Sequence, residues 1–408
     1  MVLTTRNNKI IIDKEKFLAL TFALFFYAVI IVDIFRLFGQ SYMNILDSYT
    51  DIFRNIVYIL IVIMSLITLK WYGIKKELLY VVLGFLLLLG ISIFLNDDIL
   101  KIMPPFIMFF VSRCLPGFYL GLYIKNYKTL LYYMDKFKLL VLVYCLLIIK
   151  VYSNLSGSYS ESSYMAISYN LLQAAMVILI CGLCFKKKYY FLFHAFIIFV
   201  ILVYGARGTL VCLFTFYTVV FFLLIKNRIT LKKLIYIIGI IIIGSGFAIN
   251  IDNILMFLGQ EYSFSRNLSL INADSLLDFS NRALQYEAFM KKIGENPFKF
   301  RGILSDRFFM GEIFKYEATY NVYPHNIILE CLYQFGIIVT ISLASFIIYR
   351  IIKKIYMTKG SDNVEKCMFA LFIPVPFIYL MFSGSYLISY TFWMALGYLL
   401  RRRREVNA

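Results

Sequence analysis

The stretch from Leu78 to Leu95 reads LLYVVLGFLLLLGISIFL and carries no charged side chain over its 18 residues. Lys75 and Lys76 precede it, and a polar segment follows it. An uncharged apolar run of this length can cross the hydrocarbon core of a bilayer as an α-helix. The run is continuous and does not alternate with polar residues, so it does not predict a strand of an outer-membrane barrel.

Similar apolar runs recur along the 408 residues, of which 62% are hydrophobic and 16% are charged. The mean hydropathy is +0.79, whereas soluble domains are about half apolar and about a quarter charged. We predict an all-α, polytopic integral membrane protein, a single membrane domain over 1–408 with no room for a large soluble catalytic domain. The about 12 predicted transmembrane helices are 17–35, 52–69, 78–95, 104–124, 137–152, 165–185, 189–206, 209–225, 234–250, 326–349, 368–382 and 386–400.

The net charge of +18 does not indicate a nucleic-acid partner, because most basic residues lie in short segments between the apolar runs. Seven such segments hold 27 of the 41 Lys and Arg residues, and the rest of the chain has a net charge of −2. An excess of Lys and Arg is typical of cytoplasmic loops, so we expect both termini in the cytoplasm. The predicted cytoplasmic segments are 1–16, 70–77, 125–138, 186–188, 226–233, 350–367 and 401–408.

One long polar segment, 250–324, separates the ninth and tenth predicted helices, and span counting places this loop outside the cytoplasm. Long structured loops are usually functional. Apolar residues at helical spacing predict one helix within it, capped by Ser280 or Asn281 and ending near Gly294. Arg282 then lies in the first turn, where a cation is unfavourable unless an anion binds there. The alternative is a solvated surface arginine.

Two further groups lie at the predicted outer membrane face. Arg207 is at the tip of a tight turn in Tyr204–Thr209 (YGARGT), where an arginine is unexpected unless it binds a ligand or reaches lipid headgroups. His325 lies where the loop re-enters the membrane, and a neutral imidazole there can act as a general base. Pro324 restricts the backbone just before it. The other histidine, His194, is interpreted as a packing residue inside the seventh predicted helix.

Arg113 lies in the middle of the fourth predicted helix, and an ionisable residue at that depth indicates a functional site by default. Glu330 and Asp33 are candidate partners, which leaves a purely structural ion pair as the alternative. The seven cysteines lie in apolar runs or at their edges and indicate no disulfide framework. The chain has no phosphate-binding Gly-rich loop, nucleophile elbow, zinc-binding HExxH or Asp-x-Asp metal pair, which disfavours ATP-driven transport and metal-dependent glycosyl transfer.

The order of these motifs resembles the O-antigen polymerase and O-antigen ligase superfamily of bacterial inner-membrane proteins, and the resemblance covers essentially the whole topology. Two departures are that Ala206 stands where a serine is usual, and that Thr218 occupies the glycine position of an Arg-x10-Gly motif after Arg207. The matching positions are Ala206-Arg207-Gly208 before the loop, the helix led by Arg282 within it, and His325-Asn326 followed by Glu330, Gly336 and Ile337.

The resemblance implies transfer of a sugar chain from an undecaprenyl pyrophosphate carrier in the inner membrane. It implies His325, Arg207 and Arg282 as catalytic residues, with arginine charge replacing a metal ion, and no cofactor. The leading hypothesis is a repeat-unit polymerase for O-antigen or capsule; the alternatives are an O-antigen ligase that uses lipid A core and, in another class, a lipid-linked oligosaccharide flippase or transporter. Expected partners are membrane lipid, the lipid-linked oligosaccharide, and the chain-length regulator and flippase of the same pathway. The predicted substrate-binding residues are Arg113, Arg266, Tyr323, Asn326 and Glu330.

Overall fold

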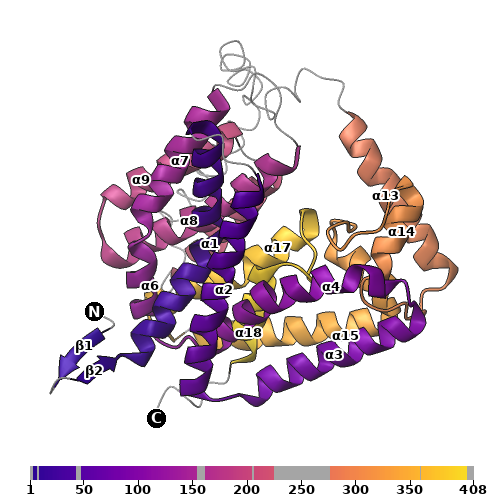
Figure 1. Ribbon diagram of the computed structural model, residues 1–408, viewed down its shortest axis with the longest axis horizontal. Helices are drawn as coiled ribbons and strands as arrows, with labels where there is room; N and C mark the ends of the chain where they lie inside the picture. The colour runs from indigo at the N-terminus through magenta and orange to yellow at the C-terminus, as the bar shows by residue number, and fades with distance from the viewer. Residues whose placement is uncertain are drawn as a thin grey trace, which may run out of the picture.

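The computed structural model describes residues 3–6, 9–42, 47–153, 161–204, 206–224, 276–358 and 360–401. These residues form helices connected by turns and loops, with one short antiparallel hairpin near the N-terminus (Figure 1). The elements are β1 (Leu3–Arg6), β2 (Lys9–Ile12), α1 (Lys14–Tyr42), α2 (Asp47–Tyr72), α3 (Lys76–Leu95), α4 (Ile99–Phe109), the π-helical turn η1 (Phe110–Cys114), α5 (Leu115–Tyr123), α6 (Tyr127–Asp135), α7 (Lys138–Ser153), α8 (Glu161–Phe185), α9 (Tyr189–Tyr204), α10 (Arg207–Leu224), α13 (Leu276–Glu295), α14 (Ser305–Phe314), α15 (Ile327–Thr358), α16 (Asn363–Phe372), α17 (Pro374–Phe382) and α18 (Tyr390–Leu400).

The described helices show that the protein is embedded in a membrane. Seven helical segments are long and apolar enough to cross a bilayer, and α9, α10 and α18 are shorter apolar helices. Each predicted span overlaps a described helix, except 234–250, which lies outside the described residues. The total of 12 spans therefore remains a prediction. The seven segments are Lys14–Gly39, Ser48–Tyr72, Lys76–Leu95, Ile99–Tyr123, Met165–Phe185, Ile327–Thr358 and Asn363–Phe382.

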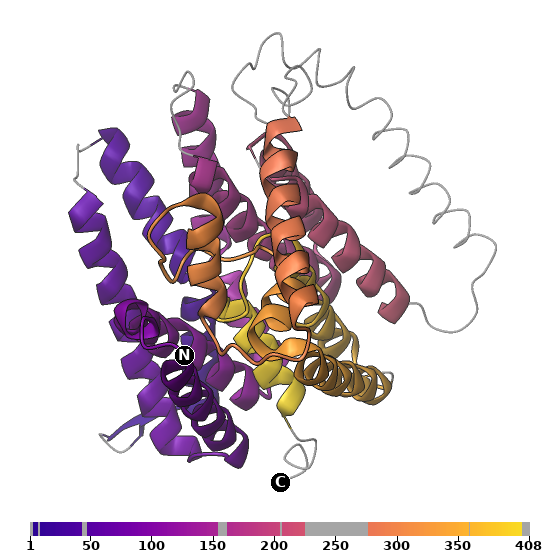
Figure 2. The same ribbon diagram turned by 90° about the vertical axis from the view of Figure 1, so that its right-hand side faces the viewer.

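The first described apolar helix, α1, begins at the same end of the molecule at which the last one, α18, ends. Asn126 Nδ2, in the turn between α5 and α6, donates to Glu15 Oε2 near the start of α1 at 3.4 Å. Arg401, directly after α18, donates to the Ile124 carbonyl of the same turn. The start of α1 and the end of α18 therefore meet beside one loop, as an even number of crossings predicts (Figures 1 and 2).

Glycines allow α5 and α18 to pack backbone against backbone. A Cβ atom at Gly121 would lie 2.2 Å from the Met394 carbonyl oxygen, and one at Gly397 would lie 2.1 Å from the Phe118 carbonyl oxygen. Gly117, four residues before Gly121, has a similar contact at 2.8 Å with the Tyr390 carbonyl oxygen. Small residues at this spacing let membrane helices approach closely and associate through van der Waals contact. This contact fixes the start of α18 relative to η1.

We expect Gly121→Ala to lower the free energy of unfolding by about 1–3 kcal/mol, because the added methyl group overlaps a backbone carbonyl that cannot move without separating the helices. The measurement is equilibrium unfolding of the purified protein in mixed micelles. Gly90→Ala in α3 is the matched control, since a Cβ there meets nothing within 4 Å. Equal stability of the two variants would contradict the close α5–α18 contact.

The segment between α10 and α15 differs from the predicted loop in two ways. The predicted helix around Arg282 is confirmed, but it begins at Leu276, so the Ser280 or Asn281 cap is wrong and Arg282 lies in the second turn. Leucine favours helix, which extends the pattern backwards. A second helix, α14, was not predicted; α13 and α14 lie together beside the start of α15 (Figure 1).

A non-helical glycine divides α15 just after its first turns. Gly336 has φ +72° and ψ 173°, a conformation available almost only to glycine. The Ile337 amide donates to the Pro297 carbonyl at 2.8 Å, and the Gln334 carbonyl accepts from Arg301 and Gly302 amides at 2.8 and 3.0 Å. The segment before α14 thus supplies the hydrogen bonds that the broken helix lacks. The nine residues before the break form a separate piece that belongs to the site.

The last two helices are separated by a non-helical loop, 383–389, where the sequence predicts that the final helix has already begun at 386. The Ser389 side chain accepts a hydrogen bond from the Phe392 amide and caps α18, so this helix begins only at Tyr390. Non-helical backbone at membrane depth is tolerated where it is buried in protein or lines a cavity. The loop 383–389 does line one.

Candidate functional site

A cavity of about 470 Å³ lies between the helices, and three of the predicted site residues, Arg113, Tyr323 and His325, line it. Its walls come from α1, η1, α8, α16, α17 and α18, from the segment before α15, and from the loop 383–389. Most of the surface is apolar. The polar and charged residues that line it are Arg113, Tyr169, Asn170, Gln173, Asn321, Tyr323, His325, Tyr379, Ser383, Ser385, Ser389, Tyr390 and Thr391.

His325 is held in an unusual backbone conformation beside the cavity. Its φ of +52° lies in the left-handed region, which residues other than glycine rarely adopt and which is often found at functional sites. The Tyr323 ring lies 4.5 Å from the imidazole, centroid to centroid. The buried Nδ1 atom has no hydrogen-bond partner among the described residues. One imidazole nitrogen of this cavity-lining residue is therefore left without a partner in the described protein.

The pKa of His325 is lowered from 6.5 to about 4, and burial is the largest cause. The positive charges of Arg282 and Arg307 contribute to this decrease, and a hydrogen bond to the Ser383 backbone opposes it. Because the shift favours the uncharged form, the imidazole is neutral at physiological pH. A neutral imidazole with a free nitrogen can accept a proton.

Arg282 reaches the end of α17, directly before the loop 383–389, and does not line the cavity itself. Its Nη1 atom donates to the Phe382 carbonyl at 3.4 Å, and it forms no ion pair within the described part of the chain. Its positive charge is among the causes that lower the pKa of His325. Arg282 can therefore offer a guanidinium group to an anion beside the imidazole.

The tight turn predicted at Arg207 is present, because α9 ends at Tyr204 and α10 begins at Arg207. A Cβ atom at Gly208 would lie 2.5 Å from Tyr169 Oη and 3.7 Å from Phe382 Cβ. Tyr169 lines the cavity, so the turn packs against its wall. The side chain of Arg207, and all of Arg266, lie outside the part of the chain that the structure describes.

Arg113 lies on the π-helical turn η1 and lines the cavity, and no carboxylate among the described residues pairs with it. Its guanidinium carbon lies 4.1 Å from the Tyr58 ring centroid and 4.5 Å from that of Phe109. Neither candidate partner pairs with it. Asp33 pairs instead with Arg36, at 3.2 Å, and Glu330 is bound within a separate cluster.

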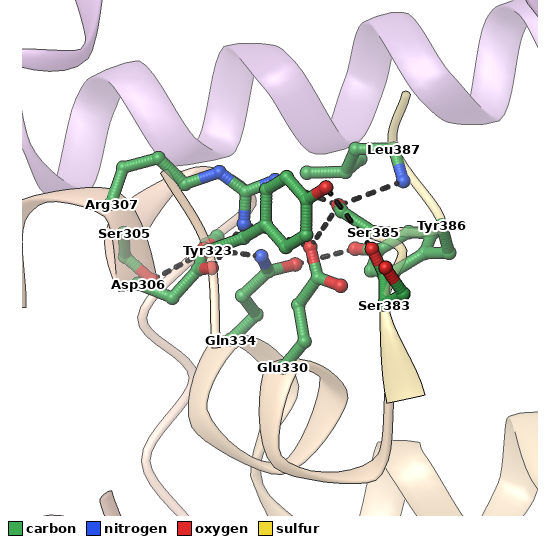
Figure 3. Close-up of polar contacts among 11 residues, drawn as sticks. Ser305, Asp306, Arg307, Tyr323, Glu330, Gln334, Ser383, Ser385, Tyr386 and Leu387 are labelled. Atoms are coloured by element: carbon green, nitrogen blue, oxygen red, sulfur yellow. Dashed lines mark hydrogen bonds and ion pairs between the residues drawn. The ribbon is translucent and has the colours of Figure 1, made fainter. Parts of the chain in front are cut away.

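That cluster is centred on Arg307, a residue that sequence reasoning missed (Figure 3). Arg307 Nη1 donates to Asp306 and, at 2.8 Å, to Glu330 Oε1, and all three side chains are 0% exposed. Arg307 Nη2 donates to Ser385 Oγ at 2.7 Å. Burial raises the pKa of Asp306, and the Arg307 charge opposes this increase. The cluster is a buried, hydrogen-bonded ion triad whose serine reaches the cavity wall.

Further hydrogen bonds extend the triad to the loop 383–389. Gln334 Nε2 donates to Asp306 Oδ1 at 2.5 Å, and the Tyr386 hydroxyl donates to Gln334 Oε1. On the cavity side, the Tyr323 hydroxyl donates to the Ser383 carbonyl at 3.3 Å. The network therefore joins α14, the first piece of α15 and the loop (Figure 3). It connects the loop 383–389 to the segment that carries His325.

The remaining predicted residues have local structural contacts. Asn326 Oδ1 accepts from the Ile328 and Leu329 amides at 2.9 and 3.3 Å, so its side chain caps α15 and does not line the cavity. His194 lies away from the cavity, with Nδ1 2.9 Å from the Ala175 carbonyl oxygen and Nε2 beside the Tyr217 hydroxyl. The interpretation of His194 as a packing residue is confirmed.

Comparisons with family models, with curated proteins and with solved structures find no match to this chain. The site is therefore interpreted from its own geometry. That geometry combines a proton acceptor, His325, with two guanidinium groups that have no carboxylate partner among the described residues, Arg113 and Arg282. Such a set can deprotonate a hydroxyl group and stabilise an oxyanion within a membrane protein.

Proposed function

We propose that the protein is a polysaccharide repeat-unit polymerase of the bacterial inner membrane, with its termini in the cytoplasm. It transfers a glycan chain from undecaprenyl pyrophosphate to the next lipid-linked repeat unit. The observation that supports this most directly is the neutral His325 imidazole, with its unpartnered Nδ1, at the wall of a cavity between apolar helices. The sequence motifs that resemble O-antigen polymerases supply the substrate class.

In the proposed reaction, His325 Nδ1 accepts the proton of an acceptor sugar hydroxyl. The hydroxyl oxygen forms a bond to the anomeric carbon of the donor chain, and the bond from that carbon to the pyrophosphate oxygen breaks. The electron pair leaves with the lipid pyrophosphate. Arg282, together with the Arg207 turn, stabilises this developing charge, and a planar guanidinium can do so with two parallel hydrogen bonds. No cofactor takes part.

The test is reconstitution of the full chain in lipid with a carrier-linked single repeat unit as the only substrate. We expect long chains and free undecaprenyl pyrophosphate to appear, also in excess EDTA, because guanidinium groups supply the positive charge. Activity that disappears with EDTA and returns with magnesium would overturn the metal-free mechanism.

A deletion strain distinguishes the polymerase from its two alternatives. Loss of a polymerase leaves single lipid-linked repeat units on the outer face of the membrane and no long chains. Loss of a ligase leaves long carrier-linked chains instead, and loss of a flippase leaves repeat units on the cytoplasmic face. Thin-layer chromatography of the extracted lipid carriers shows whether single repeat units or long chains are present. Labelling of the sugars from outside the membrane shows which face they are on, and the two measurements together distinguish the three outcomes.

A further inference from the structure

The cavity has polar groups besides those of the segment that carries His325, and Arg113 and Gln173 are two of them. Tyr390 lines the same cavity, and its hydroxyl donates to Gln173 Oε1 at 3.0 Å. Since the Gln173 oxygen is occupied, its amide N–H groups remain as donors at the cavity wall. Arg113 and Gln173 therefore present a cation and neutral donors together.

The charge of Arg113 is not balanced by the described protein. Asp33 is a candidate partner, but it forms an ion pair with Arg36 at 3.2 Å and accepts hydrogen bonds from Tyr144 and Asn170, both at 2.9 Å. An ion without a partner at membrane depth costs several kcal/mol. The two flanking rings recover only about 0.5–2 kcal/mol each through cation–π contact. An anion in the cavity would supply the missing compensation.

The backbone at Arg113 supports the same conclusion independently. The turn η1 (Phe110–Cys114) is π-helical, between α4 and α5. Such single turns insert one residue into an α-helix, change the direction of the side chains around it and are frequent at functional sites. Here the altered turn carries the one arginine of the span Ile99–Tyr123 and places it between Tyr58 and Phe109 at the cavity.

We propose that Arg113 and Gln173 form a second anion-binding subsite, separate from Arg282 and His325, that takes an oxyanion carried by the substrate. Its identity as substrate rests on the proposed function. Two sources share this chemistry: the pyrophosphate of the lipid-linked acceptor, and the carboxylate of an acidic sugar in the repeat unit. A guanidinium binds either group with paired hydrogen bonds.

The experiment measures binding of two probes, inorganic pyrophosphate and glucuronate, to the full chain in nanodiscs of zwitterionic lipid. Arg113→Met keeps the side-chain length and remains apolar between the two rings, but removes every donor. We expect it to weaken binding of at least one probe roughly tenfold or more, the effect of losing a charge-assisted contact. Lys101→Met is the matched control: Lys101 precedes Arg113 in the same span, is exposed and pairs with Asp98.

The affected probe identifies the source. Weaker pyrophosphate binding indicates the lipid carrier, and weaker glucuronate binding indicates an acidic sugar. We also expect the ligand-free Arg113→Met protein to melt no lower than the wild type, because an uncompensated charge has been removed. Unchanged binding of both probes, or a variant that no longer folds, would overturn the subsite. Since neither probe is transferred, intact probe binding without chain growth would count against the polymerase alone.

Discussion

Replacing His325 by alanine is expected to abolish chain growth while properly folded protein remains in the membrane. His325 is the proposed proton acceptor, and its Nδ1 has no competing partner among the described residues. Loss of a positioned general base typically lowers the rate roughly 100- to 10,000-fold. The measurement is the initial rate of chain extension in the reconstituted system. His194→Ala is the matched control, because His194 is buried away from the cavity; equal rates for both variants would contradict the assignment.

The pH dependence provides a second test of the same group. Transfer needs the neutral imidazole, and the pKa of His325 is lowered to about 4. The rate should therefore stay constant as the pH falls to about 5 and decline only below that, instead of near the ordinary histidine pKa. Arg282→Gln removes a charge that lowers this pKa, so the acidic limb should move to higher pH. A limb near 6.5 in the wild type would argue against a buried base.

Arg307→Ala is expected to have the largest effect on stability. The substitution leaves Asp306 and Glu330 fully buried without their cation. Breaking a buried ion pair by removing one partner costs about 3–5 kcal/mol, because an uncompensated charge remains. Equilibrium unfolding in mixed micelles measures the change. Lys299→Ala, an exposed substitution in the same segment, should change the free energy of unfolding by less than about 0.5 kcal/mol.

A triple variant distinguishes how much the charges and how much the side-chain packing contribute to stability. Arg307→Met combined with Asp306→Asn and Glu330→Gln removes all three charges together and should recover much of the lost stability. If it remains as unstable as Arg307→Ala, the network stabilises the site through its shape and not through its ion pairs. Ser385→Ala, which removes only the hydroxyl that Arg307 contacts, should be milder than either.

The membrane helices could be predicted because a long apolar run has no other stable conformation in lipid. The Arg207 turn, the helix containing Arg282 and the packing role of His194 follow from equally local signals. The sequence also places His325 directly before α15, and the structure has it there. The sequence could not predict which side chains share a site, since Arg113, Tyr323 and His325 line the same cavity but come from distant parts of the chain.

The Arg307 network was missed because its members look ordinary one by one. Arg307 is one of several basic residues in a polar loop, and Ser385 lies in the short connection between the last two predicted helices. The sequence does contain a signal, because the charged pair Asp306-Arg307 lies between the apolar pairs Ile303-Leu304 and Phe308-Phe309. Either the charged pair is buried together with its apolar neighbours, or those neighbours are exposed to solvent. The start of α18 was placed too early because its Ser389 cap is preceded by another apolar stretch.

The shortness of α18 has an electrical consequence. Its 11 residues span about 16 Å, roughly half of a hydrocarbon core about 30 Å thick. Its first turn and Arg113, near the middle of the span Ile99–Tyr123, line the same cavity. In the proposed orientation, an anion that moves from the outer surface to Arg113 therefore crosses about half of the transmembrane field. A negative cell interior opposes that movement by about 1 kcal/mol per unit charge at roughly 100 mV. Occupancy at Arg113 in an energised cell is then lower than in a nanodisc, where no field exists.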